Sequence, residues 1–86
     1  MIIILRMNLT DTPNPNAKKL VYLHDHEIGK NLEKDALDKN AIEFKILCID
    51  GVEAIFSGPG FLTVIKSTES NWDTINKEFI SIFDTL

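Results

Sequence analysis

The chain has 86 residues, of which 44% are hydrophobic and 26% are charged, and its formal net charge is −4. This length can build one modest hydrophobic core, so we expect a single domain over residues 1–86. The acidic balance, with basic residues scattered along the chain, excludes the basic stripe typical of a nucleic-acid-binding protein.

Cysteine usage and hydropathy indicate the compartment. Cys48 is the only cysteine, and an unpaired thiol suits a reducing setting, either the bacterial cytoplasm or an organelle lumen such as the mitochondrial matrix. The apolar start Met1–Leu5 has no basic segment before it and is interrupted by Arg6, unlike a signal peptide. No run approaches the ~20 apolar residues of a membrane span, so we expect a soluble protein without a membrane partner.

The chain begins with an extended pattern. Ile2–Leu5 is apolar and rich in β-branched residues, and the turn-rich stretch Thr10–Asn16 follows it. This order predicts a strand leading into a loop. Pro13 and Pro15 fix their own φ angles, and neighbouring Asn and Asp side chains can bond the backbone, so the loop should be ordered. Lys18–Leu23 predicts a second strand.

The polar stretch His24–Lys39 is interpreted as a connector without regular structure, because its charge density disfavours a helix or strand. A helix is predicted over Ala41–Cys48, with Asn40 as its N-cap and Glu43 as the reciprocal partner. Gly51 would follow its end, where glycine adopts the left-handed cap conformation at low cost. The buried side of this helix would consist of Ile42, Ile46, Leu47 and Ile49.

The second half of the chain contains the clearest hairpin pattern. Val52–Phe56 and Phe61–Lys66 are short apolar stretches on either side of Ser57-Gly58-Pro59-Gly60. After a polar segment that ends in Ser70 and Asn71, either of which could cap a helix, apolar residues recur at helical spacing. They are Trp72, Ile75, Phe79, Ile82, Phe83 and Leu86, and they predict an amphipathic C-terminal helix.

These elements predict an α+β fold, a two-layer ββαββα sandwich with a four-stranded antiparallel sheet and two helices on one face. The other face raises a question, because Ile2–Leu5 and Phe61–Ile65 are apolar at nearly every position and do not alternate with polar residues. Either loops and the N-terminal segment cover this face, or it is a surface for a partner or for self-association.

The candidate metal ligands are few. Cys48 lies among apolar neighbours, so we expect a small buried side chain and not a reactive thiol. The pattern His24-Asp25-His26-Glu27 could place two imidazoles on one side of an extended segment. It lacks a third spaced ligand and does not fit the HExxH pattern, so a solvated loop is the preferred interpretation, with metal binding through His24 and His26 as the alternative.

The sequence offers no catalytic arrangement. It contains no GxSxG pattern, and both histidines lie in one short segment, which leaves no obvious nucleophile–base pair. Gly58-Pro59-Gly60 joins two strands and lacks the form of a phosphate-binding loop. Trp72 lies on the apolar stripe of the last helix and is expected to pack against the core. We therefore predict no catalytic, cofactor-binding or metal-ligating residue, and no enzyme.

Three segments in this order resemble a known family. They are Thr12–Ala17 (TPNPNA) before a strand, Ile49–Val64 with the motifs IDGV and FSGPGFLTV, and Asn71-Trp72 at the start of the last helix. Together they are similar to the N-terminal domain of Nfu/NifU-type iron–sulfur scaffold proteins. The similarity covers nearly the whole chain, and only His24–Lys39 departs from the family in length and content.

The resemblance implies a division of labour between two domains. In that family a separate C-terminal domain carries a CxxC motif that, paired across two protomers, binds a [4Fe–4S] cluster for delivery to recipient proteins. By resemblance, Pro13 and Pro15 fix a loop, Gly51 forms the helix exit, and Gly58–Gly60 forms the hairpin tip. None of them is a cluster ligand, and no cofactor is expected in this domain.

The expected function is therefore that of an accessory protein-interaction domain in iron–sulfur cluster assembly and delivery. Its partners would be biogenesis proteins, recipient apo-proteins or the C-terminal cluster domain, and the end at Leu86 on an apolar stripe favours a fragment of a longer protein. Two alternatives remain. The chain could bind iron or another divalent metal through His24 and His26, or it could be a homodimerising module that uses its uncovered sheet face.

Overall fold

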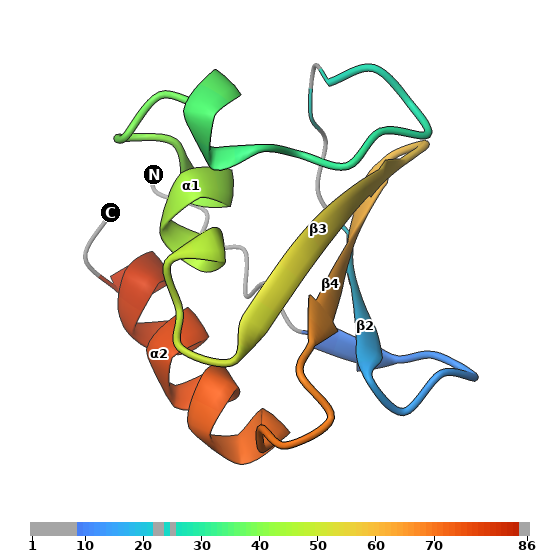
Figure 1. Ribbon diagram of the computed structural model, residues 1–86, viewed down its shortest axis with the longest axis vertical. Coiled ribbons are helices and arrows are strands. Elements are labelled where there is room, and N and C mark those ends of the chain that lie inside the picture. Colours follow the sequence, from blue (N-terminus) through green and yellow to red (C-terminus); the bar gives the residue numbers. More distant parts are fainter. Residues whose placement is uncertain (1–8, 22–23, 25, 85–86) are drawn as a thin grey trace, which may run out of the picture.

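The computed structural model describes residues 9–21, 24 and 26–84, which form a four-stranded antiparallel sheet with two α-helices on one face (Figure 1). In chain order the elements are β1 (Leu9–Asp11), β2 (Ala17–Val21), the 3₁₀ turn η1 (Lys34–Ala36), α1 (Ile42–Leu47), β3 (Val52–Gly58), β4 (Phe61–Lys66) and α2 (Trp72–Asp84). The strand order across the sheet is β1-β2-β4-β3. This architecture confirms the predicted α+β sandwich.

The first described strand is not the one that the sequence predicts at Ile2–Leu5. The predicted strand Ile2–Leu5 lies outside the described residues, and β1 falls partly in the stretch Thr10–Asn16 that was interpreted as a loop. The reason is pairing with β2, in which Leu9 lies opposite Leu20 and Asp11 opposite Lys18. Extended pairing thus continues up to Asp11, and the turn begins only at Thr12.

The predicted hairpin is confirmed, with a shorter connection. β3 continues through Gly58, which pairs with Phe61 at the start of β4. Pro59 and Gly60 alone connect the strands, and Gly60 has a φ of +74°. A proline followed by a glycine of positive φ is the residue combination that a type II turn requires.

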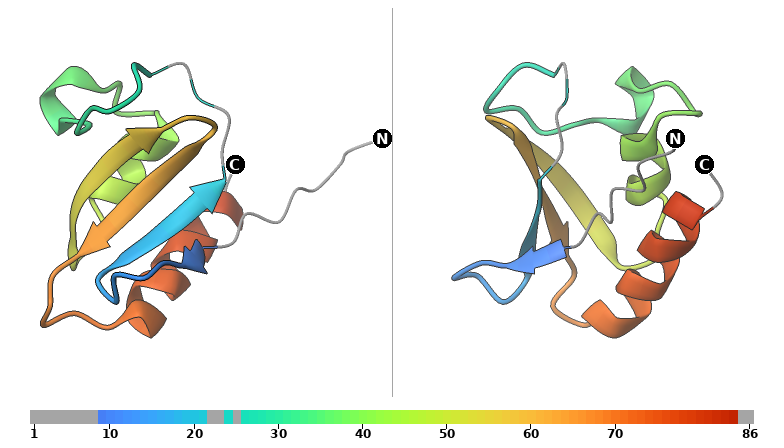
Figure 2. Two further views of the ribbon diagram at one scale, coloured as in Figure 1. Left: turned by 90° about the vertical axis from the view of Figure 1, so that its right-hand side faces the viewer. Right: turned by 180° about the vertical axis from the view of Figure 1, so that it is seen from behind.

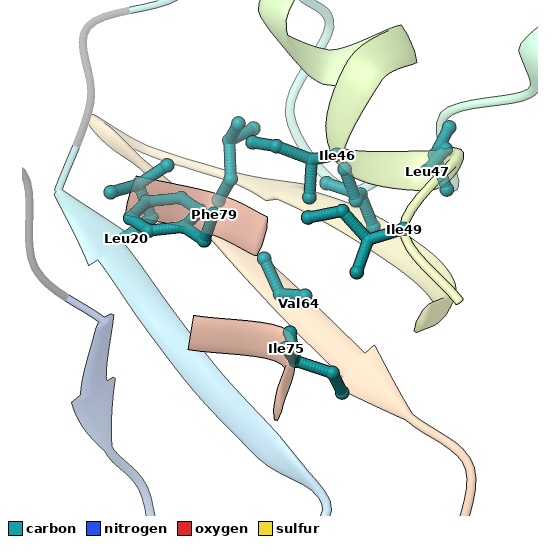
Figure 3. Close-up of a cluster of buried hydrophobic side chains, with 9 residues drawn as sticks. Leu20, Ile46, Leu47, Ile49, Val64, Ile75 and Phe79 are labelled. Atoms are coloured by element: carbon teal, nitrogen blue, oxygen red, sulfur yellow. The ribbon is translucent and has the colours of Figure 1, made fainter. Parts of the chain in front are cut away.

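The core lies between the sheet and the helices (Figure 3). The sheet contributes Leu20, Ile55, Leu62 and Val64, the α1 region contributes Ile46, Leu47 and Ile49, and α2 contributes Ile75 and Phe79. Ile75 and Phe79 are spaced by one helical turn, so a single face of α2 enters the core. Burying each large apolar side chain contributes about 1.5–3 kcal/mol to the free energy of folding.

The helix ends confirm one predicted cap and correct another. The Asn71 side-chain oxygen accepts a hydrogen bond from the Asp73 amide at 2.7 Å, which caps α2. The predicted Asn40 cap of α1 is wrong, because Ala41 occupies that position without a side-chain hydrogen bond. The reciprocal partner, Glu43, is only 7% exposed and turns toward the connector instead. Within the described residues, no helix is long and apolar enough to cross a bilayer.

Substitution of two glycines, Gly51 and Gly60, can separate the cost of a strained backbone from the cost of a steric clash with a neighbouring side chain. Gly51 and Gly60 both have positive φ, but an added Cβ would lie 2.6 Å from Ser70 Oγ at Gly51 and would meet nothing within 4 Å at Gly60. We expect Gly60→Ala to lower the free energy of unfolding by about 1 kcal/mol. Gly51→Ala should cost about 1–2 kcal/mol more, because Ser70 must move. Urea denaturation measures both values, and equal losses would contradict the crowding at Gly51.

Candidate functional site

The connector after β2 runs back along β3 and covers its free edge. The Gly29 amide donates to the Ser57 carbonyl at 2.8 Å, the Ser57 amide donates to the Lys30 carbonyl at 2.8 Å, and the Leu32 amide donates to the Ile55 carbonyl at 2.9 Å. This edge of β3 therefore presents few free backbone groups to another strand. The expectation of a connector is confirmed, with the single turn η1 near its end.

His24 fastens the start of the connector to the hairpin. Its Nε2 atom lies 2.7 Å from the Gly58 carbonyl oxygen and 3.1 Å from that of Phe61, while its Nδ1 atom accepts the His26 amide at 3.2 Å. Carbonyl oxygens only accept hydrogen bonds, so Nε2 carries the proton and Nδ1 does not. Both ring nitrogens of His24 are therefore engaged by backbone groups.

His26 fastens the same segment to α1. Its Nε2 atom contacts a carboxylate oxygen of Glu43, whose side chain is 9% exposed. A carboxylate buried to this extent is costly without a partner, because it has lost its hydration. The pair thus holds the connector against the helix layer. It also gives the buried Glu43 carboxylate a hydrogen-bonding partner in place of water.

The histidine geometry bears on both earlier interpretations. The solvated-loop interpretation of His24 and His26 is wrong, because both side chains are half-buried and bonded to the fold. Metal binding would have to compete with these bonds. Within residues 9–21, 24 and 26–84, no group of three His, Cys, Asp or Glu side chains is placed to hold a metal ion.

The loop between β1 and β2 is ordered by its own side chains, as predicted. The Thr12 hydroxyl donates to the Ala17 carbonyl at 2.8 Å, and the Asn14 side-chain oxygen accepts the Asn16 amide at 2.9 Å. From outside the loop, the Lys66 ammonium donates to the Asn16 side-chain oxygen at 3.0 Å. The loop is thereby tied to the end of β4.

Trp72 joins this loop to α2. It packs against the core cluster, as predicted, and its indole N–H donates to the Pro15 carbonyl at 2.8 Å. The ammonium groups of Lys18 and Lys66 lie 5.4 and 5.9 Å from its ring centroid. A hollow of about 380 Å³ lies beside the ring, lined by Asp11, Thr12, Pro13, Asn14, Pro15, Ala17, Lys18 and Trp72.

Cys48 is exposed, so the prediction of a buried thiol is wrong. It is the C-cap of α1, and the helical period turns Ile46, Leu47 and Ile49 into the core while it turns Cys48 outward. The thiol lines a hollow of about 380 Å³ together with Lys39, Phe44, Lys45, Ile49, Glu78 and Ile82.

In Figure 2 (left), no described helix lies in front of the strands on the sheet face opposite α1 and α2, here called the outer face. The predicted segment Ile2–Leu5, one candidate to cover this face, lies outside the described residues. The strand registers assign the residues of the outer face, because cross-strand neighbours share a face. Leu62, Val64 and Lys66 of β4 point to the helix side and are buried. Of the residues with a register partner, the outer face therefore contains Thr10, Ala17, Lys19, Val21, Ala54, Phe56, Gly58, Phe61, Thr63 and Ile65. The exposed Glu53 lies at the irregularity between Val52 and Ala54 and has no partner in this register.

An apolar platform occupies the hairpin end of the outer face. Val21 is 68% exposed and Phe56 is 40% exposed. The Phe61 ring lies over Gly58, where an added Cβ would come within 2.2 Å of the ring. The Lys19 ammonium lies 4.2 Å from the Phe61 ring centroid and is the one charged group among the outer-face residues. The sequence indicated an apolar face, but not this pairing of a cation with an aromatic ring.

A double-mutant cycle measures the coupling between His26 and Glu43. We expect His26→Ala to leave a buried carboxylate without its partner, and the coupling free energy from His26→Ala and Glu43→Ala to be about 1–3 kcal/mol in urea denaturation. The exposed pair Glu27 and Lys30, separated by 3.8 Å, is the matched control and should give less than about 0.5 kcal/mol. Similar values for the two pairs would refute a stabilising tether at Glu43.

Comparison with curated proteins finds relatives in staphylococci. Conserved virulence factor C of Staphylococcus haemolyticus is 29% identical over 77 residues, which are 87% of this chain and 21% of that protein. The Staphylococcus aureus protein of the same name is 30% identical over 81 residues, covering 90% of this chain and 21% of that protein. The chain thus spans about a fifth of the length of these relatives.

Solved structures share the fold. The crystal structure of protein SAV1430 from Staphylococcus aureus matches with a TM-score of 0.69 at 24% identity, covering 92% of this chain and 99% of that one. The solution structure of a NifU-like protein from Saccharomyces cerevisiae also gives 0.69, at 22% identity, covering 93% of this chain and 76% of that one. Residues 7–86 match the family described as scaffold protein Nfu/NifU N terminal, and the chain therefore belongs to this family.

Proposed function

We propose that the chain is an accessory protein-interaction domain of an iron–sulfur scaffold or carrier protein. It would assist cluster assembly and delivery by contact, without ligating the cluster. Membership of the Nfu/NifU N-terminal family supports this role. Because the chain spans only 21% of its curated relatives, what the whole protein does is also part of the proposal.

The ligand chemistry supports a contact role. Iron in a cluster is held by several thiolates, and this sequence supplies Cys48 alone. The proposal places the remaining thiolates on a separate CxxC domain, as the family resemblance implies. Partners would then be that domain, other biogenesis proteins or recipient apo-proteins, in a reducing compartment such as the bacterial cytoplasm, where an exposed thiol persists.

The single observation that carries the contact role is the apolar outer face. An open face of an antiparallel sheet normally exposes polar residues, whereas this one exposes Val21 and Phe56 beside the Phe61 ring. Contiguous exposed apolar surface marks interaction sites. Catalysis has less support, because His24 and His26, the two histidines of the sequence, hold the connector in place.

The test combines binding with cluster transfer. The ¹⁵N-labelled chain is titrated with a purified CxxC domain of an Nfu-type scaffold, in apo and [4Fe–4S]-loaded forms. We expect saturable shift changes, and faster cluster transfer from that domain to an apo-ferredoxin when the chain is present. An unrelated domain of equal size and net charge is the control. Unchanged spectra up to about 1 mM, together with an unchanged transfer rate, would refute the proposal.

A further inference from the structure

We propose that the outer face docks an amphipathic helix of a partner protein, with its apolar stripe on Val21, Phe56 and Phe61 and an acidic side chain against Lys19. The inference deepens the proposed function and rests on it in one respect, that the occupant is a protein. It adds the surface, the shape of the partner segment and the charge that the segment carries.

The composition of the outer face shows that it suits an apolar partner better than water. Of its ten residues with a register partner, Lys19 alone is charged, and Thr10 and Thr63 are the only others with a polar side chain. The remaining positions are aliphatic, aromatic or glycine. Removing exposed apolar area of this kind from water favours binding of a partner.

The platform is also held in its shape before a partner arrives. The end of the Phe61 ring occupies the place where a Cβ at residue 58 would lie, which is possible because Gly58 has none. The Lys19 ammonium, 4.2 Å from the ring centroid, restrains it further through a cation–π contact. A side chain already fixed in this way loses little conformational entropy on binding, which raises affinity.

The dimensions of the face favour a helix over a second copy of the chain. Four strands spaced by about 4.8 Å, with about 3.4 Å per residue along β4, span at most roughly 19 by 20 Å, or about 400 Å², because the described strands β1 and β2 are shorter than β4. A stable dimer buries about 800 Å² on each partner. A helix of about 14 residues is roughly 21 Å long and 10 Å wide, and α2, with 13 residues, packs on the opposite face of the sheet together with α1 (Figure 1).

Charge also bears on the choice of occupant. The net charge of −4 repels a second copy of the chain more strongly than a short helix that carries fewer negative charges, at low ionic strength. The outer face itself presents only the Lys19 cation, which complements a carboxylate beside the apolar stripe of a helix. Lys19 is half-buried at the rim of the platform. Its contact with a partner carboxylate should therefore set the preference among partner segments. The strength of this contact should decrease as salt is added.

The test uses two synthetic amphipathic peptides of about 14 residues with the same leucine stripe. The residues beside the stripe are glutamates in one peptide and lysines in the other. On titration into the ¹⁵N-labelled chain, the glutamate peptide should shift the amide signals of Val21, Phe56 and Phe61 and bind about tenfold more tightly than the lysine peptide. A tenfold difference corresponds to about 1.4 kcal/mol.

Three variants make the test specific. Lys19→Glu should invert the preference between the two peptides, and Phe56→Ser should weaken binding of the glutamate peptide about tenfold. Ile80→Ser is the matched control, because Ile80 is 48% exposed on α2 in the helix layer, so affinity should not change. The fold of each variant is checked by its amide spectrum. If Phe56→Ser unfolds, Lys19→Glu still decides the outcome.

Each contrary result has a defined meaning. Shift changes confined to the helix layer, or an unchanged peptide preference in Lys19→Glu, would overturn the docking site. Sedimentation equilibrium that shows dimers formed through the outer face would also overturn it, because a second copy would then be the occupant. Peptide docking without any contact to the CxxC domain would refute the proposed function alone. Contact of that domain with a different surface would refute only this inference.

Discussion

The register of β4 is the constraint on which the rest of the structure depends. β4 is hydrogen-bonded on both sides, and its pairing places Leu62 opposite Leu20 and Val64 opposite Ile55 in the core. A slip of one residue would exchange the two faces of the strand. Because Phe61 and Ile65 are also apolar, hydrophobicity alone specifies this register weakly. The tight Pro59-Gly60 connection and the fit of Phe61 over Gly58 favour the observed pairing.

A second constraint holds the connector. Ser57 of β3 is fully buried, and its hydroxyl lies within hydrogen-bond distance of the Glu27 and Lys30 carbonyls, while its own amide and carbonyl bond Lys30 and Gly29. One polar residue inside the sandwich thus has every hydrogen-bonding group satisfied by the connector. Together with the contact between His26 and Glu43, it fixes a segment that has almost no regular structure of its own.

Local pattern predicted the elements well and the side-chain contacts poorly. The hairpin, the α2 cap at Asn71 and the two-layer fold follow from apolar spacing and from glycine positions. The roles of Glu43, His24 and His26 depend on partners 17 to 37 residues away in sequence, which no local pattern reveals. Cys48 was misplaced because apolar neighbours in sequence do not fix the side of a helix end. The spacing of His24 and His26 suggested a metal site, whereas in the fold both imidazoles anchor the connector.

The treatment of the sheet edges explains why contact should occur through the outer face. An exposed strand edge invites another strand, and an apolar sheet with such an edge is prone to aggregate. Here the connector pairs with the edge of β3. Backbone pairing is thus restricted at this edge, whereas the side chains of Val21, Phe56 and Phe61 remain accessible. In the proposed docking, recognition would then depend on shape and charge at the face, where Lys19 can discriminate between partners.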